Sequence, residues 1–191
     1  MTGDTVLSDG PLEPSDEALM LAYAAGEATA FEPLYRRHQD ALYRYLLRGC
    51  QSTHTAQELF QDVWQKLIQA RLRYRADAPF GAYLYKLAHN RLVDHWRSQR
   101  PQVPAPEPEL ENLPAPESQR PDETELRRQQ AVRLLRALAT LPLEQREIIV
   151  LREEQELTLE QIAVIQGVGR ETVKSRLRYA LAKLREVMTH D

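Results

Sequence analysis

The sequence predicts an all-α fold with two small helical domains joined by a proline- and glutamate-rich linker. Apolar residues recur at intervals of three and four through two separate blocks of the 191-residue chain. Neither block shows the sustained apolar–polar alternation that strands require. Between them, residues 101–121 are rich in proline and glutamate and cannot form a packed core. We therefore expect domains at 13–100 and 122–188, separated by a flexible acidic linker.

Helix-start signals mark the elements of the first domain. Ser15 precedes two acidic residues and is expected to cap the first helix. Thr55 and Glu58 have the spacing of a capping box, which predicts that another long helix starts there. Apolar periodicity predicts a further helix from about residue 80 to residue 97. We expect this domain to be helical throughout.

The second domain ends in a predicted helix-turn-helix. Thr158 and Gln161 are spaced as a capping box for a short helix, and residues 167–169, "GVG", form the turn. The next helix, "RETVKSRLRYALAKLRE", has an apolar face expected to contain Val173, Leu177, Ala180, Leu181 and Leu184. The N-terminal half of a recognition helix meets the DNA major groove. The candidate DNA-binding residues are Arg170, Thr172, Lys174, Ser175, Arg176 and Arg178.

Charge is segregated along the chain, although the formal net charge is only −3. Residues 63–100 hold eight basic and two acidic residues, and residues 165–185 hold six basic and one acidic. By contrast, residues 1–62 carry ten acidic and four basic residues, and residues 101–125 carry seven acidic and one basic. Two basic segments separated by an acidic spacer indicate two nucleic-acid contacts on one chain.

Several function classes find no support in the sequence. Cys50 is the only cysteine, so we expect no intrachain disulfide, a reducing cytoplasmic location and burial of this thiol in the core. No apolar run approaches the roughly 18 residues of a membrane span, and no secretory signal is recognisable. The five histidines lack metal-ligand spacing, and no phosphate loop or nucleophile motif occurs. We expect no metal, no cofactor and no catalytic site.

Both helical blocks resemble conserved regions of bacterial sigma factors. The segments "AQELFQDVWQKL" and "PFGAYLYKLAHNRLVDHWRSQR" resemble the second conserved region of that family. The segment "LPLEQREIIVLREEQELTLEQIAVIQGVGRETVKSRLRYALAKLRE" resembles the fourth. With no third region between them, the chain is similar to the compact extracytoplasmic-function group. The resemblance implies a dissociable subunit of RNA polymerase that binds the core enzyme and promoter DNA and starts transcription. Many relatives are held inactive by an anti-sigma factor, often in the membrane.

The resemblance also assigns core-docking residues to the first domain. In the family, a helix with a pattern like "ELFQDVW" docks on the clamp helices of the polymerase. The matching residues here are Glu58, Leu59, Gln61, Asp62 and Trp64. Glu58 has an alternative role as the capping-box partner of Thr55, and both roles stay open. Trp64 is expected in the hydrophobic core, because large aromatic residues usually pack there.

The segment that follows resembles the part of sigma factors that melts the minus-ten element. A basic groove follows the phosphates of the separated strand, and an aromatic face or pocket receives an extruded base. The candidates are Arg71, Arg73, Tyr74, Arg75, Lys86, Asn90, Arg91 and Arg97. Phe80, in the same segment, is instead expected to pack in the core.

The linker is long enough to join two promoter contacts. The two elements lie roughly 17 base pairs apart, which is about 58 Å of duplex at about 3.4 Å per pair. A proline-rich segment of this length extends to roughly 65 Å. Its acidic charge is expected to repel DNA and to discourage either domain from folding back onto it. The second domain would then bind the minus-thirty-five element while the first opens the minus-ten element.

Two alternatives stay open at this point. An ordinary helix-turn-helix transcription factor would need a sensing or phosphorylatable α/β domain, whereas the first block is predicted to be helical. A sigma-like adaptor or decoy would bind a regulatory partner without initiating transcription. Loss of the basic residues would mark a decoy, and both basic segments retain theirs here.

Overall fold

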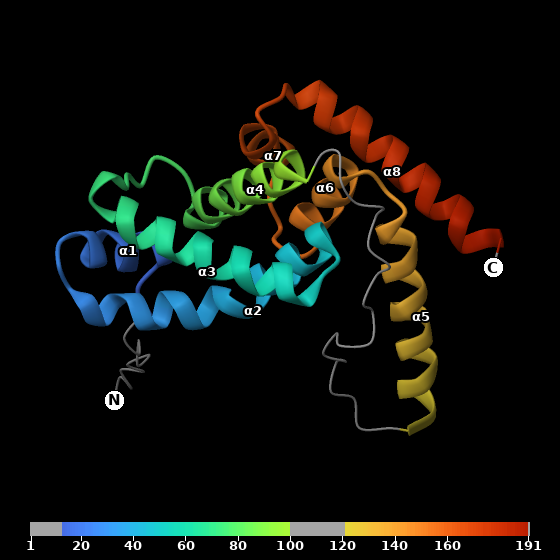
Figure 1. Ribbon diagram of the computed structural model, residues 1–191, viewed down its shortest axis with the longest axis horizontal. Helices are drawn as coiled ribbons and strands as arrows, with labels where there is room; N and C mark the ends of the chain where they lie inside the picture. The colour runs from blue at the N-terminus through green and yellow to red at the C-terminus, as the bar shows by residue number, and fades with distance from the viewer. Residues whose placement is uncertain (1–12, 100–120, 191) are drawn as a thin grey trace, which may run out of the picture.

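The computed structural model describes residues 13–99 and 121–190, and within these ranges it contains helices and no strands (Figure 1). The N-terminal group consists of α1 (Asp16–Ala24), η1 (Ala28–Ala30), α2 (Phe31–Cys50), α3 (Thr53–Ala70), η2 (Arg71–Arg73) and α4 (Phe80–Ser98). The C-terminal group consists of α5 (Pro121–Ala139), α6 (Leu143–Glu153), α7 (Leu159–Gln166) and α8 (Arg170–His190). The all-α prediction is confirmed. The predicted linker lies outside the described residues, except for its last residue.

Local sequence signals set most of the helix ends. The Ser15 hydroxyl accepts a backbone hydrogen bond of 3.2 Å at the start of α1, as expected. Thr158 and Gln161 form the predicted capping box of α7, with distances of 2.8 and 3.2 Å. The predicted box at Thr55 is wrong. The N-cap of α3 lies three residues earlier, because the Ser52 hydroxyl accepts a hydrogen bond from the Thr55 backbone N–H at 3.4 Å.

The core of the N-terminal group is rich in aromatic residues. Trp64 is 5% exposed, and its ring centroid lies 4.9 Å from that of Tyr35 and 5.6 Å from that of Phe31. Phe80 is completely buried in the same cluster. Cys50 is also buried, and this burial raises the pKa of its thiol. The expected core positions of Trp64, Phe80 and Cys50 are confirmed.

Helices α7 and α8 form the predicted helix-turn-helix. Gly167 makes the turn possible with a φ of 67°, a left-handed conformation that glycine adopts without strain. Val173, Ala180 and Leu184 of α8 are buried, whereas Leu181 is 45% exposed. The prediction for Leu181 is therefore wrong. Helix α8 extends beyond the helices that cover it, so only a narrow stripe at helical spacing is buried (Figure 1).

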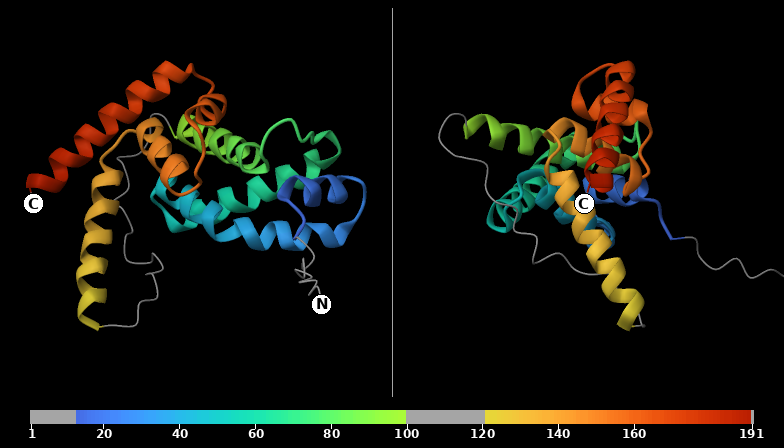
Figure 2. Two further views of the ribbon diagram at one scale, coloured as in Figure 1. Left: turned by 180° about the vertical axis from the view of Figure 1, so that it is seen from behind. Right: turned by 90° about the vertical axis from the view of Figure 1, so that its right-hand side faces the viewer.

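The two helical groups pack directly on one another. Helix α6 lies against α2, and α7 lies against α4, as the front and rear views show (Figures 1 and 2). One hydrophobic cluster runs through both groups and includes Leu46 and Leu92 from the first and Ile148, Ile162 and Val173 from the second. Helix α5 and the C-terminal half of α8 diverge from this body. The sequence predicted two domains but not this contact between them.

Candidate nucleic-acid and protein interfaces

The basic half of α8 faces solvent. Five of its six candidate DNA-binding residues are exposed: Arg170, Thr172, Lys174, Ser175 and Arg178. The sixth, Arg176, is half-buried and donates a 2.8 Å hydrogen bond to Oε1 of Gln166 at the end of α7. Arg176 therefore braces α8 against α7, while the other five residues form an accessible polar surface.

Exposed carboxylates accompany these basic residues. Arg170 forms an ion pair with Glu160 of α7, and its Nη1 lies 3.3 Å from Oε1 of Glu171. The Lys174 ammonium lies 3.9 Å from the other Glu171 oxygen. The pKa of Glu160 is lowered, first by a hydrogen bond from its own backbone N–H and then by Arg170. Because exposed ion pairs contribute little free energy, a DNA phosphate can replace these carboxylates at small cost.

A second basic surface lies around η2 and along α4. Exposed candidates here are Arg73, Arg75, Asn90 and Arg97. Arg71 is half-buried: its Nη1 donates a 3.0 Å hydrogen bond to the carbonyl of Ile68, and its guanidinium carbon lies 5.8 Å from the centroid of the Tyr23 ring. Arg71 therefore fixes the end of α3, whereas the other four side chains reach solvent.

Tyr74 points into the core instead of the surface. It is 7% exposed, and its ring centroid lies 5.1 Å from that of Tyr83 and 6.3 Å from that of Phe80. Burial, with a contribution from the Glu17 charge, raises the pKa of Tyr74 to about 12. The apolar side chain that does face solvent in this basic run is Leu72, which is 75% exposed. Leu72 was not among the candidate residues selected from the sequence. The pattern that could have pointed to it is an apolar residue between two arginines, "RLR".

Lys86 and Arg91 are both engaged within the molecule. The Lys86 ammonium donates hydrogen bonds to the carbonyls of Val164 and Ile165, at 3.1 and 2.7 Å, near the C-terminal end of α7. Arg91 forms an ion pair with Asp62 of α3, and its second terminal nitrogen lies 3.8 Å from a carboxylate oxygen of Asp94. In this conformation neither cation is free to meet a DNA phosphate.

Helices α3 and α4 border a polar groove of about 580 Å³. Four of the candidate core-docking residues line it: Glu58, Leu59, Gln61 and Asp62. The fifth, Trp64, does not line the groove and is buried against Phe31 and Tyr35. Glu58 is exposed, and its Oε2 lies 3.6 Å from Nδ1 of His54. His95 lies on the α4 side of the groove, where burial lowers its pKa.

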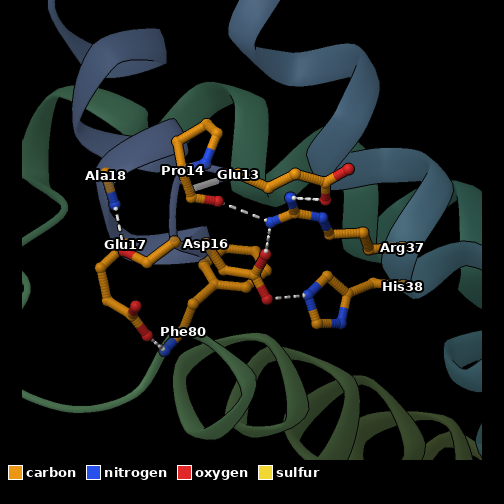
Figure 3. A network of polar contacts seen from close by, with 9 residues as sticks. Glu13, Pro14, Asp16, Glu17, Ala18, Arg37, His38 and Phe80 are labelled. Carbon is orange, nitrogen blue, oxygen red and sulfur yellow. Dashed lines mark hydrogen bonds and ion pairs between the residues drawn. The ribbon is translucent and has the colours of Figure 1, made fainter. Parts of the chain in front are cut away.

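Helix α1 supplies the missing cap of α4. Pro79, which precedes α4, makes no side-chain cap hydrogen bond. Instead Oε1 of Glu17 accepts a 2.7 Å hydrogen bond from the backbone N–H of Phe80 (Figure 3). This hydrogen bond is the main reason that the pKa of Glu17 is lowered. Glu17 therefore fixes the junction between the basic loop that follows η2 and the helix that carries Asn90.

Asp16 ties the same end of α1 to α2. Its two carboxylate oxygens accept hydrogen bonds from Nη1 of Arg37 at 2.7 Å and from Nε2 of His38 at 2.6 Å (Figure 3). Burial opposes ionisation of Asp16, but these two hydrogen bonds lower its pKa overall. The His38 ring also packs on Phe80, with centroids 5.1 Å apart. The sequence identified Asp16 and Glu17 only as first-turn acids, because their partners lie far away in sequence.

Comparison with known proteins decides the family. Two family models match the chain: "Sigma-70 region 2" at residues 34–102 and "Sigma-70, region 4" at residues 137–186. The chain is 31% identical to the ECF RNA polymerase sigma factor SigM of Mycobacterium tuberculosis, over 94% of this chain and 87% of that protein. The chain belongs to the extracytoplasmic-function sigma factors. It is also 34% identical to the RNA polymerase sigma-E factor of Streptomyces coelicolor, over 84% of this chain and 87% of that protein.

Solved structures show the same fold. A structure of CnrH in complex with the cytosolic domain of CnrY matches 93% of this sigma factor and 99% of that chain, with a TM-score of 0.69 and 23% identity. The sigma factor RpoE in complex with the anti-sigma factor NepR, from Bartonella quintana, matches 84% and 98%, with a TM-score of 0.67 and 20% identity. None of the helices in the described part of this sigma factor combines the length and the apolar character that a membrane span requires.

Proposed function

We propose that this sigma factor docks on core RNA polymerase through the groove between α3 and α4. Glu58, Gln61 and Asp62 offer polar groups there, while Leu59 and Trp64 support the helix from the core side. A shallow polar groove with a partly buried carboxylate suits a partner that presents basic side chains. Sigma factors are specificity subunits without catalysis of their own, and we propose that this chain likewise has no catalytic site.

The promoter contacts divide between the two helical groups. The basic half of α8 binds the minus-thirty-five element in the major groove, through Arg170, Thr172, Lys174, Ser175 and Arg178, with Arg176 as a brace. The surface around η2 and α4 opens the minus-ten element, and Arg73, Arg75, Asn90 and Arg97 follow the separated strand. The observation that carries this assignment is the exposed basic half of α8 placed immediately after a short bracing helix.

The division of the chain predicted from the sequence fits this assignment. Residues 13–100 serve core docking and minus-ten opening, residues 122–188 serve minus-thirty-five recognition, and 101–121 connect them. Tyr74, Lys86, Arg71 and Arg91 are occupied in the described conformation, so their DNA contacts require local rearrangement. An anti-sigma factor is a further proposed partner, because solved structures with this fold include a sigma factor bound to one.

Runoff transcription tests the function itself. Purified core polymerase is incubated with and without the protein on fragments of DNA from the source genome. Discrete transcripts that depend on the protein are expected, and their start sites define the promoter. Core binding without transcripts would point to a missing activator or an unsuitable template, whereas absence of both transcripts and core binding would favour the adaptor alternative.

Three test variants and two controls test the residue assignments. Lys174→Ala and Arg178→Ala should each weaken promoter binding and flatten its salt dependence, whereas Lys183→Ala, exposed farther along α8, should not. Asp62→Arg should weaken core association, whereas Gln65→Arg, exposed one turn farther along α3 and not part of the groove lining, should not. Test variants that behave like the control on the same helix would contradict the interface assigned to that helix.

A further inference from the structure

The contact between the two helical groups is built around a buried carboxylate. Glu147 of α6 is 2% exposed and projects into the surface of the N-terminal group. The Tyr45 hydroxyl of α2 donates a 2.6 Å hydrogen bond to its Oε1. Nδ1 of His89 on α4 lies 3.0 Å from both carboxylate oxygens. A buried carboxylate is costly without donors, so the N-terminal group holds α6 at a specific position.

Neighbouring groups complete this polar cluster. The Gln166 amide of α7 donates a 3.2 Å hydrogen bond to the second Glu147 oxygen. Burial, with a contribution from the Glu147 charge, raises the pKa of Tyr45 well above its ordinary value. The Tyr45 hydroxyl therefore stays protonated and remains a donor. By contrast, the Tyr85 hydroxyl beside it is buried and has no hydrogen-bond partner among the described residues.

A second set of contacts joins α6 to the end of α2. The Arg146 guanidinium is 6% exposed and donates to the carbonyl of Arg48 in the last turn of α2. Arg48 in turn forms an ion pair with Glu154. The Gln51 amide crosses between the groups as well, with a 3.2 Å hydrogen bond to the carbonyl of Ala139. A cation at the carbonyls of a helix C-terminus is favourable, so these contacts stabilise the packing of the C-terminal group on the N-terminal group. We call this packing the closed arrangement.

The closed arrangement brings the two proposed DNA-binding elements together. Lys86, a candidate for the minus-ten strand, instead caps α7 of the helix-turn-helix with hydrogen bonds of 2.7 and 3.1 Å. Promoter elements about 17 base pairs apart are separated by roughly 58 Å along the duplex. Because α4 packs against α7, which in turn packs against α8, the α4 surface and the basic half of α8 cannot occupy both elements at once. The groove between α3 and α4, however, remains open.

We propose that Tyr45, His89 and Lys86 form an autoinhibitory surface on the N-terminal group. The C-terminal group of the same chain covers this surface. The closed form docks on the polymerase through α3 but does not engage both promoter elements. Promoter opening requires Glu147 to leave its donors. This inference rests on the proposed function, because it presumes that α4 and α8 bind the two elements.

Two matched pairs of variants test the surface in the full-length protein. Tyr45→Phe removes the hydroxyl that binds Glu147, and its control Tyr85→Phe removes the neighbouring hydroxyl that has no partner. Glu154→Gln removes the ion pair with Arg48, and its control Glu153→Gln changes an exposed residue whose ion pair within the described residues is with its neighbour Arg152. The second pair lies nearer the surface, so it tests the proposal even where Tyr45→Phe folds poorly.

Opening and function are measured separately. Dyes attached after the substitutions Gln65→Cys and Lys183→Cys, with buried Cys50 left unlabelled, report the distance between the groups by energy transfer without polymerase. Loss of one hydrogen bond to a charged group shifts the closed–open equilibrium about tenfold or more. Tyr45→Phe and Glu154→Gln should therefore lower transfer and raise the rate of runoff transcription at limiting protein, Tyr45→Phe by about tenfold. Both controls should match the wild type.

The outcomes separate the two proposals. Lower transfer with an unchanged transcription rate would overturn autoinhibition, and unchanged transfer in both test variants would overturn the role of these contacts. Failure of the wild type and every variant to support transcription would contradict the proposed sigma function. In that case energy transfer alone would still show whether Glu147 and Glu154 hold the groups together.

Discussion

Replacing Gly49 by alanine tests how closely α2 and α4 approach. Gly49 lies in the last turn of α2, where a Cβ atom would stand 2.5 Å from Cδ1 and 2.8 Å from Cδ2 of Leu92. Leu92 is completely buried, so its side chain cannot swing into solvent. Helix propensity alone would make alanine the better residue by about 1 kcal/mol. Overpacking of a filled core costs about 1–3 kcal/mol, so the net expectation is destabilisation of about 1 kcal/mol.

Urea unfolding followed by circular dichroism measures this effect. The urea concentration at the midpoint should fall, while m, the dependence of the unfolding free energy on urea concentration, should stay the same. The double variant isolates the contact. Leu92→Ala alone should cost about 2–5 kcal/mol, because it leaves a cavity in the core. In the Gly49→Ala background the new methyl group occupies part of that space, so the combined cost should fall short of the sum by about 1 kcal/mol. Stabilisation by Gly49→Ala, or simple additivity of the two costs, would refute this close packing.

Two further predictions concern polar contacts. The pKa values of Asp16 and Glu17 are lowered in the folded protein, so their contribution to stability is present above the unfolded values near 4 and is lost as the pH falls through the lowered values. The wild type should therefore lose more thermal stability between about pH 5 and pH 3 than Asp16→Asn/Glu17→Gln, and parallel melting curves would contradict this. Arg146→Met should destabilise by about 1–3 kcal/mol in urea unfolding, because it leaves buried carbonyls unpaired, whereas exposed Arg152→Met should change stability by less than about 0.5 kcal/mol.

Much of the fold follows from local signals. Ser15, Thr158, Gln161 and Gly167 act at their own helix ends, so a few residues of sequence suffice to predict their roles. The cap prediction at Thr55 was wrong because Ser52, three residues earlier, is also a good N-cap residue and forms the cap instead. The spacing pattern alone does not rank two such candidates. Cap prediction is thus reliable where one candidate stands alone.

The contact between the groups could not be predicted in the same way. Arg146 and Glu147 follow each other in a helical pattern, where adjacent charges usually indicate a solvent-exposed face. Their partners come from the other group: Tyr45 lies 102 positions from Glu147 in the chain. Lys86 was predicted to contact DNA, but its partners in the structure are backbone carbonyls. Every residue carries a carbonyl, so the sequence does not show which ones a lysine will bind. Long-range polar partners of this kind become visible only when the helices are assembled.

The hydrophobic cluster shared by the two groups has a consequence for synthesis of the chain. At about 5–20 residues per second, the ribosome adds Glu147 roughly 5 to 20 s after Tyr45. During that interval the nascent N-terminal helices carry an apolar face whose cover, Ile148, Ile162 and Val173, does not yet exist. A fragment that ends at residue 99 would keep this face uncovered permanently. We expect such a fragment to self-associate, while the full-length chain completes its own core.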